Sequence, residues 1–213
     1  MSCVCRAALA NELAAEALFD EGVEAARNAC VAGATLAAAA ITASAWYDNP
    51  LTGARALRDC LEKLGALPLS VDAWRAAFAP GVHPETGDAF APGFGYVEPR
   101  QESWLLASAS RLAECPRAEK LRFYLSHCHP MPSSRLNVAG LAALVYCDHG
   151  LSLDDAEREF LLCRVDVALR EAARARTLGI ARFPFFSDAY FYEGASPPAR
   201  TRSLSEAMRR VGL

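Results

Sequence analysis

The stretch SLDDAEREFLLCRVDVALREAARAR, residues 152–176, predicts a long amphipathic helix. Ser152 and Asp155 stand in the positions of a capping box, in which two side chains satisfy backbone groups at the start of a helix, here with Asp where Glu is usual. The acidic start and the arginine-rich end of the stretch both complement the helix dipole. We therefore expect one continuous helix here, within a chain that is helical elsewhere as well.

The flanking sequence predicts an all-α fold. Alanine-rich residues 9–19 and 23–47 are expected to form two helices. The second should end at Asp48-Asn49-Pro50, because a proline disfavours the helical conformation of the residue before it. Ser70 is a candidate N-cap for the helix that follows it. Further helices are expected at residues 53–65, 71–78, 102–114, 117–127, 138–146 and 203–211.

Two long irregular stretches interrupt these helices. Residues 81–100 are rich in Gly and Pro, and HPMPSSRLN, residues 129–137, leads into an apolar helix. Loops of this length inside a compact domain are usually functional, so we expect a site near them. Towards the C-terminus, the aromatic stretch FPFFSDAYFYEG, residues 183–194, predicts a short extended segment.

Length and composition indicate one ordinary globular domain over residues 1–213, with a polar tail at 199–213. A chain of 213 residues with 53% hydrophobic content can bury a substantial core. The net charge is -3, and Lys and Arg are scattered, so the basic stripe that nucleic-acid binding needs is missing. Residues 29–47 reach transmembrane length, but small residues predominate, which predicts a buried helix and no membrane partner.

The cysteines predict a reducing, cytoplasmic protein, because all eight are irregularly spaced and no secretory leader is evident. The stretch HCHP, residues 127–130, lies ahead of Cys147 and His149, but no pair has the C-x-x-C spacing typical of zinc sites. No metal is predicted. No nucleophile elbow or oxyanion motif surrounds a cysteine, so a Cys–His nucleophilic enzyme is not predicted either.

Four segments together resemble the citrate synthase superfamily, especially its shorter, citryl-CoA-lyase-like members. They are NPLTGARALRDCLEKLG (49–65), PGFGYVEPR (92–100), NVAGLAALVYCDHGL (137–151) and RVDVALREAARARTLGIARFPFFSDAYFYEGASPP (164–198). Their order and approximate spacing agree with the family over roughly residues 20–198, which is more specific than any single motif. The resemblance implies a citrate synthase-like helical domain, truncated at the N-terminus and with its small domain incomplete or reduced.

The resembled family joins an acyl-CoA to a 2-oxo acid, or reverses that step. A carboxylate removes a proton beside the thioester, and two histidines donate hydrogen bonds to the enolate and keto oxygens. The resemblance places these histidines on Thr52 and Tyr96, and the carboxylate on Ala139. Thr and Tyr can each donate a hydrogen bond, whereas alanine accepts no proton. All three catalytic positions are therefore substituted.

Other site positions follow from the same resemblance. Glu21 stands in a DEG turn where the shorter members have Asp-His-Gly, and Gly93, Gly95 and Arg100 match the segment that binds coenzyme A. A coenzyme A thioester is thus the ligand that the resemblance allows, and no cofactor is established. Arg164 matches an arginine that binds a substrate carboxylate, and its alternative interpretation is a surface charge on a helix.

Substitute groups for the missing catalytic set are available in the sequence. Glu21, His83, Glu98 and His129 could replace it, or could be solvated loop residues.

The missing His/His/Asp set favours a non-catalytic or regulatory subunit. The resemblance implies a homodimer, or a heteromer with an intact citrate synthase-like paralogue, and the small-residue helix at 23–47 permits close helix approach. An alternative is an active acyl-CoA and 2-oxo acid enzyme of altered substrate, with Thr52 and Tyr96 as neutral donors. A third hypothesis is a small-molecule-binding module that keeps the cleft without the chemistry.

Overall fold

The computed structural model describes residues 3–17, 21–82, 89–95, 99–128 and 135–178. The chain divides into two compact units, Met1–Arg182 and Phe183–Leu213, and every described residue belongs to the first. The segments expected at residues 183–194 and 203–211, and the tail from residue 199, lie outside the described residues.

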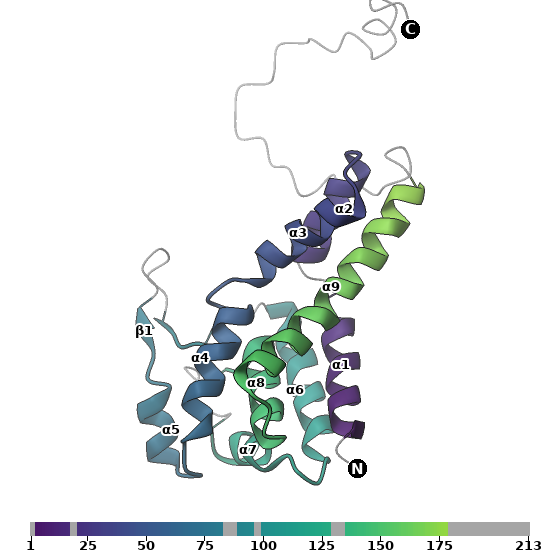
Figure 1. The fold of residues 1–213 in the computed structure, drawn as a ribbon. Helices are drawn as coiled ribbons and strands as arrows, with labels where there is room; N and C mark the ends of the chain where they lie inside the picture. Colours follow the sequence, from purple (N-terminus) through teal and green to yellow (C-terminus); the bar gives the residue numbers. More distant parts are fainter. Residues whose placement is uncertain (1–2, 18–20, 83–88, 96–98, 129–134, 179–213) are drawn as a thin grey trace, which may run out of the picture. The chain divides into compact units, whose positions relative to one another are not determined.

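The all-α prediction is confirmed, since helices make up nearly all the described regular structure (Figure 1). The elements follow in the order α1 Cys3–Ala17, α2 Glu21–Val31, α3 Leu36–Tyr47, α4 Ala54–Gly65, α5 Val71–Ala77, β1 Gly81–Val82, β2 Ala89–Phe90, α6 Pro99–Ala113, α7 Glu119–Phe123, the π-turn η1 Tyr124–Cys128, α8 Val138–Asp148 and α9 Leu153–Leu178.

Helix α9 is the element that the opening stretch predicts, and it packs against α1, α2, α3, α4 and α8. The Ser152 hydroxyl accepts a hydrogen bond from the backbone N–H of Asp155 at 3.2 Å and donates one to the Asp155 carboxylate at 2.8 Å. The capping pair of Ser152 and Asp155 is therefore present, but it differs from the usual capping box. The shorter Asp155 carboxylate accepts from the Ser152 hydroxyl instead of from the Ser152 backbone N–H.

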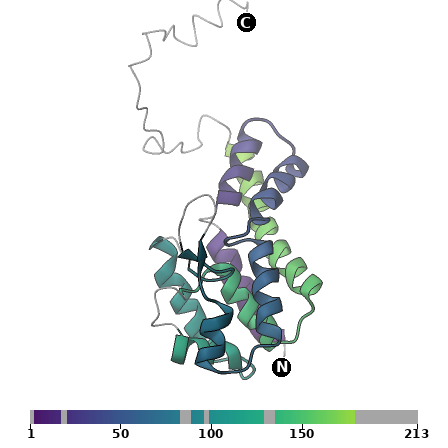
Figure 2. The ribbon, with the colours of Figure 1, turned by 90° about the vertical axis from the view of Figure 1, so that its left-hand side faces the viewer.

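The prediction of one helix over residues 23–47 is wrong, because the chain turns between α2 and α3. Gly33 has a φ of +96°, a left-handed conformation that ends α2, and the Thr35 hydroxyl then caps α3 by accepting from the Ala38 N–H. The two helices pack against each other and against the second half of α9, as both views show (Figure 2). The described helices include none that is long and apolar enough to cross a bilayer.

The prediction that residues 81–100 form only loop is also wrong. Gly81 pairs with Phe90 and Val82 with Ala89 in a short antiparallel hairpin, β1–β2. Helix α6 already begins at Pro99, where proline suits the first turn because its missing N–H would have no helical partner.

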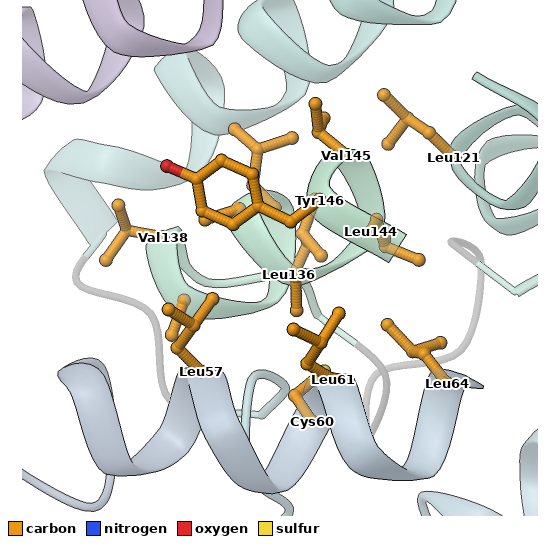
Figure 3. Close-up of a cluster of buried hydrophobic side chains, with 14 of the residues drawn as sticks. Leu57, Cys60, Leu61, Leu64, Leu121, Leu136, Val138, Leu144, Val145 and Tyr146 are labelled. Carbon is orange, nitrogen blue, oxygen red and sulfur yellow. The ribbon is translucent and has the colours of Figure 1, made fainter. Parts of the chain in front are cut away.

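The main hydrophobic core forms where α4 packs on α8. Every residue of α8 from 138 to 146 is buried, so this helix is apolar on all sides. Figure 3 shows four side chains of α4 pointing toward it: Leu57, Cys60, Leu61 and Leu64. Their three- and four-residue spacing places them on one stripe of α4, as the sequence predicts.

Helix α1 is joined to this core by apolar and ionic contacts. Leu9 and Leu13 are completely buried. The Glu12 carboxylate accepts hydrogen bonds from the Ser108 hydroxyl at 2.6 Å and from the Arg111 guanidinium at 3.0 and 2.9 Å. Burial raises the pKa of Glu12, but the hydrogen bonds from Arg111 and Ser108 outweigh it and hold that pKa below its ordinary value.

This geometry makes the attachment of α1 sensitive to acid. Because the folded pKa of Glu12 is lowered, its contribution is present above the unfolded value of about 4.3 and is lost as the pH falls through the folded value. Glu12→Gln should cost about 1 kcal/mol at pH 7, and this difference should shrink as the pH falls below about 4.3. Urea unfolding across that range measures it, with the exposed Glu62→Gln on α4 as the control; a pH-independent cost would contradict the assignment.

Candidate functional site

Three segments that are distant in the sequence meet at Asn137, which is buried at the start of α8. Its side-chain N–H donates to the carbonyl of Leu51 at 2.8 Å, and its side-chain oxygen accepts from the N–H of Gly140 at 3.0 Å. Its backbone N–H donates to the carbonyl of Gly93 at 3.1 Å. One residue therefore joins the turn before α4, the turn after β2 and the start of α8, which we call the three-segment junction.

The first segment of the junction is organised by Asn49. Its side-chain oxygen accepts from the backbone N–H groups of Leu51, Thr52 and Gly53 at 3.0, 2.7 and 3.1 Å, and from the Thr52 hydroxyl at 3.3 Å. Several donors that point at one oxygen resemble an anion-binding nest, but here the acceptor is the Asn49 side chain of the same turn. The hydrogen-bond donors of the turn, including the Thr52 hydroxyl, therefore already have an acceptor within the turn.

The second segment approaches α8 through two glycines. Gly93 has a φ of +80°, and a Cβ placed on Gly140 would lie 2.1 Å from the Gly93 carbonyl oxygen. A Cβ on Gly93 would also lie 2.8 Å from the Cys60 sulfur on α4. Only glycine at both positions allows the turn to lie directly on α4 and α8.

Aromatic packing fixes the same turn. Gly95, with a φ of +99°, donates its N–H to the Arg135 carbonyl at 2.7 Å. The buried Phe94 ring lies 4.5 Å from the Phe78 ring and 5.7 Å from the Tyr124 ring, measured between centroids. The Tyr124 hydroxyl in η1 in turn accepts from the Leu136 N–H at 3.1 Å. The glycines predicted to bind a cofactor thus have a backbone role in the structure, and cofactor binding by them stays a prediction.

Arg164 on α9 completes the junction. Its side chain is only 1% exposed, so the interpretation as a surface helix charge is wrong. Its guanidinium carbon lies 4.5 Å from the centre of the Tyr47 ring and 5.1 Å from that of the Phe160 ring, within cation–π range. Its Nη1 donates to the Thr52 carbonyl at 3.4 Å, so α9 meets the turn that precedes α4.

The other predicted site residues divide between described and undescribed parts of the chain. Ala139 is fully buried within α8, next to Gly140, and Glu21 is exposed as the first residue of α2. Arg100 lies in α6, but its side chain is not described. The remaining candidates lie outside the described residues: Tyr96, Glu98, His83 and His129.

Sequence reasoning missed the two asparagines that hold the junction together. Asn137 precedes an apolar helix, which is a typical N-cap position, and Asn49 precedes a proline in a turn. These signals identify caps and turns. They do not identify the carbonyl of Leu51, which lies far away in the sequence.

The described groups near the junction offer little acid–base or metal chemistry. Burial raises the pKa of the Cys60 thiol, which keeps it protonated and unreactive near neutral pH. Within residues that the structure describes, no cluster of three or more His, Cys, Asp or Glu side chains is arranged to hold a metal ion.

Comparisons with known proteins do not assign the chain to a family. No protein-family model matches the sequence, and neither a curated protein nor a solved structure matches it. The resemblance to citrate synthases therefore rests on the quoted motifs, of which the structure brings NPLTG, PGFG, NVAG and Arg164 together.

The glycine contact at the junction makes a stability prediction. Gly140→Ala should destabilise the fold by about 2 kcal/mol or more, because its methyl group would overlap the Gly93 carbonyl and force α8 and the turn apart. Chemical denaturation measures the loss. Gly65→Ala, at the end of α4 with no atom within 4 Å of the added methyl, is the matched control and should be neutral or stabilising by up to about 1 kcal/mol. Equal stability of Gly140→Ala and wild type would contradict the described contact.

Proposed function

We propose that this chain is a non-catalytic or regulatory subunit of an oligomer, with the framework of a citrate synthase-like site but without its chemistry. The observation that carries the proposal is Ala139. The resemblance assigns the catalytic carboxylate to this position, and a buried methyl group cannot accept a proton. Thr52, at one of the two histidine positions, directs its hydroxyl to Asn49 at 3.3 Å.

The size of these losses favours a role without turnover. A positioned general base contributes about a hundredfold to ten-thousandfold to a rate, and removal of one oxyanion donor costs about a hundredfold to a thousandfold. Because the family mechanism uses these groups in one transition state, their joint loss removes most of the acceleration.

The outer face of α3 supports assembly with another chain. No charged residue occurs in α3, and Ile41 and Trp46 on it are 71% and 46% exposed. The exposed small residues beside them are Ala37, Ala38 and Ala45. An uncharged helix face with small side chains allows a second helix to approach closely. The subunit would form a homodimer, or a heteromer with an intact citrate synthase-like paralogue.

The proposal predicts that the purified chain shows neither citrate synthase nor citryl-CoA lyase turnover. Affinity purification of the native complex, followed by mass spectrometry, should recover a second copy or an intact paralogue. Turnover that falls when Tyr96 is changed to Phe and Thr52 to Val would instead support the alternative, an active enzyme with neutral hydrogen-bond donors. Recovery of a homodimer alone would exclude the heteromer.

The buried arginine favours a second function, the binding of a small carboxylate without chemistry. Arg164 lies close to the Tyr47 and Phe160 rings and beside the Thr52 carbonyl, where a guanidinium is shielded from water and interacts strongly with anions.

Thermal-shift measurements test this binding with citrate, oxaloacetate and a coenzyme A thioester. A ligand at about a hundred times its dissociation constant stabilises a fold by about 2.7 kcal/mol, which should raise the melting temperature by several degrees. Arg164→Met, which keeps the length and loses the charge, should abolish the shift, whereas Arg55→Met on the exposed start of α4 should preserve it. No shift with any of the three ligands would exclude binding of these compounds.

A further inference from the structure

Two leucines of α9 lie outside both hydrophobic clusters of the described chain. Leu162 is 61% exposed, and Leu169 is half-buried but packs against neither cluster. Helix residues are about 100° apart around the axis, so positions two before and five after the buried Arg164 both lie on the side away from the core. Within the described part of the chain, the two leucines therefore lie together on the outer face of α9.

Charged residues mark the two ends of this face. Asp155 and Arg176 are exposed, and with the two leucines they stand at intervals of seven residues, in the order Asp155, Leu162, Leu169 and Arg176. A seven-residue interval is the repeat of helices that pair side by side. The Asp155 carboxylate accepts from Arg158 of its own helix at 2.9 Å, whereas Arg176 forms no ion pair with a described residue. The guanidinium of Arg176 can therefore pair with a carboxylate of another chain.

The order acid, leucine, leucine, base is complementary to itself when it is reversed. If a second copy of α9 lies antiparallel across the midpoint of the four positions, Leu162 of each copy meets Leu169 of the other. In the same arrangement, Asp155 of each copy meets Arg176 of the other. A parallel pair would instead place Asp155 against Asp155 and Arg176 against Arg176, where like charges repel. The charges therefore favour a second copy, and they favour the antiparallel direction.

We propose that the outer face of α9 is an interface between two copies of this chain, packed antiparallel around Leu162 and Leu169. Two ion pairs, each between Asp155 of one copy and Arg176 of the other, set the direction and the register. The four positions span about 30 Å of helix, so the contact extends along most of α9. This inference rests on the proposed oligomer, and it names the surface and the partner.

The other residues of this face fit the same arrangement. Asp166 approaches its own copy near the twofold axis, but it is paired with Arg170 of the same helix at 3.0 Å, so each copy balances this charge itself. Arg158 faces Ala173 of the second copy, where the small alanine leaves room for the longer side chain.

Analytical ultracentrifugation of the full chain tests the proposal. The wild type should form a dimer. Leu162→Glu should raise the dissociation constant of that dimer by at least about tenfold, because it places two carboxylates in the apolar centre of the contact. Val82→Glu changes another apolar residue, 74% exposed on β1, and is the matched control that should leave the dissociation constant unchanged. Circular dichroism shows whether each variant keeps its helices.

Charge reversal tests the direction and the register. Arg176→Glu and Asp155→Arg should each weaken the dimer by about twofold to tenfold, because each breaks both exposed ion pairs of the contact. The double variant should return to within about threefold of the wild type, since the pairs form again with their signs exchanged. Asp155→Arg also removes the capping contact with Ser152, but the double variant carries the same loss, so its recovery reports on the ion pairs.

Four outcomes overturn the inference. They are a wild type that stays monomeric at its highest soluble concentration, a dimer that Leu162→Glu leaves unchanged, a double charge variant that does not recover, and a dimer that Ile41→Glu dissociates while Leu162→Glu does not. The last result would place the contact on α3 and leave the proposed function standing. The absence of turnover is measured separately on the same chain, so a failure here is distinguishable from a failure of the proposed function.

Discussion

The hydrogen bonds of Asn137 are the constraint on which the rest of this structure depends. A buried amide side chain must satisfy its donor and acceptor groups inside the protein, and Asn137 does so with the Leu51 carbonyl and the Gly140 N–H. Together with its backbone hydrogen bond to Gly93, these bonds hold the turn before α4 and the turn after β2 against the start of α8. Interactions within each segment cannot fix the positions of the three segments relative to one another. Removing the amide would leave buried polar groups without partners in two segments at once.

The junction also connects the two hydrophobic clusters of the described chain. The larger cluster lies around α4 and α8, and the smaller one lies between α2, α3 and the second half of α9. The turn held by Asn49 joins α3 to α4, and Arg164 contacts that turn from α9. Because the smaller cluster consists largely of alanine, it buries little apolar surface, and we infer that α2 and α3 depend on this connection.

Local sequence signals predicted the helices well and their tertiary partners poorly. The three- and four-residue spacing in residues 53–65 and the capping pair Ser152 and Asp155 are contained within one helix, so the sequence predicts them directly. The turn at Gly33 was missed because the alanines on both sides have no hydrophobic period to interrupt. Burial of Arg164 could not be predicted, because it depends on Tyr47 of α3, which is far away in the sequence, as well as on Phe160 one turn earlier on α9.

The structure separates the residues that shape the junction from those that would perform chemistry. Asn49, Asn137, Gly93 and Gly140 are each required by hydrogen bonding or by close approach of the backbone, whatever the function. A chain that lost them would lose stability, whereas a chain with alanine at position 139 keeps a well-packed α8. The residues of these turns are therefore explained by packing and hydrogen bonding alone. They do not indicate a reaction, which is why the proposed function rests on Ala139 and not on the glycines.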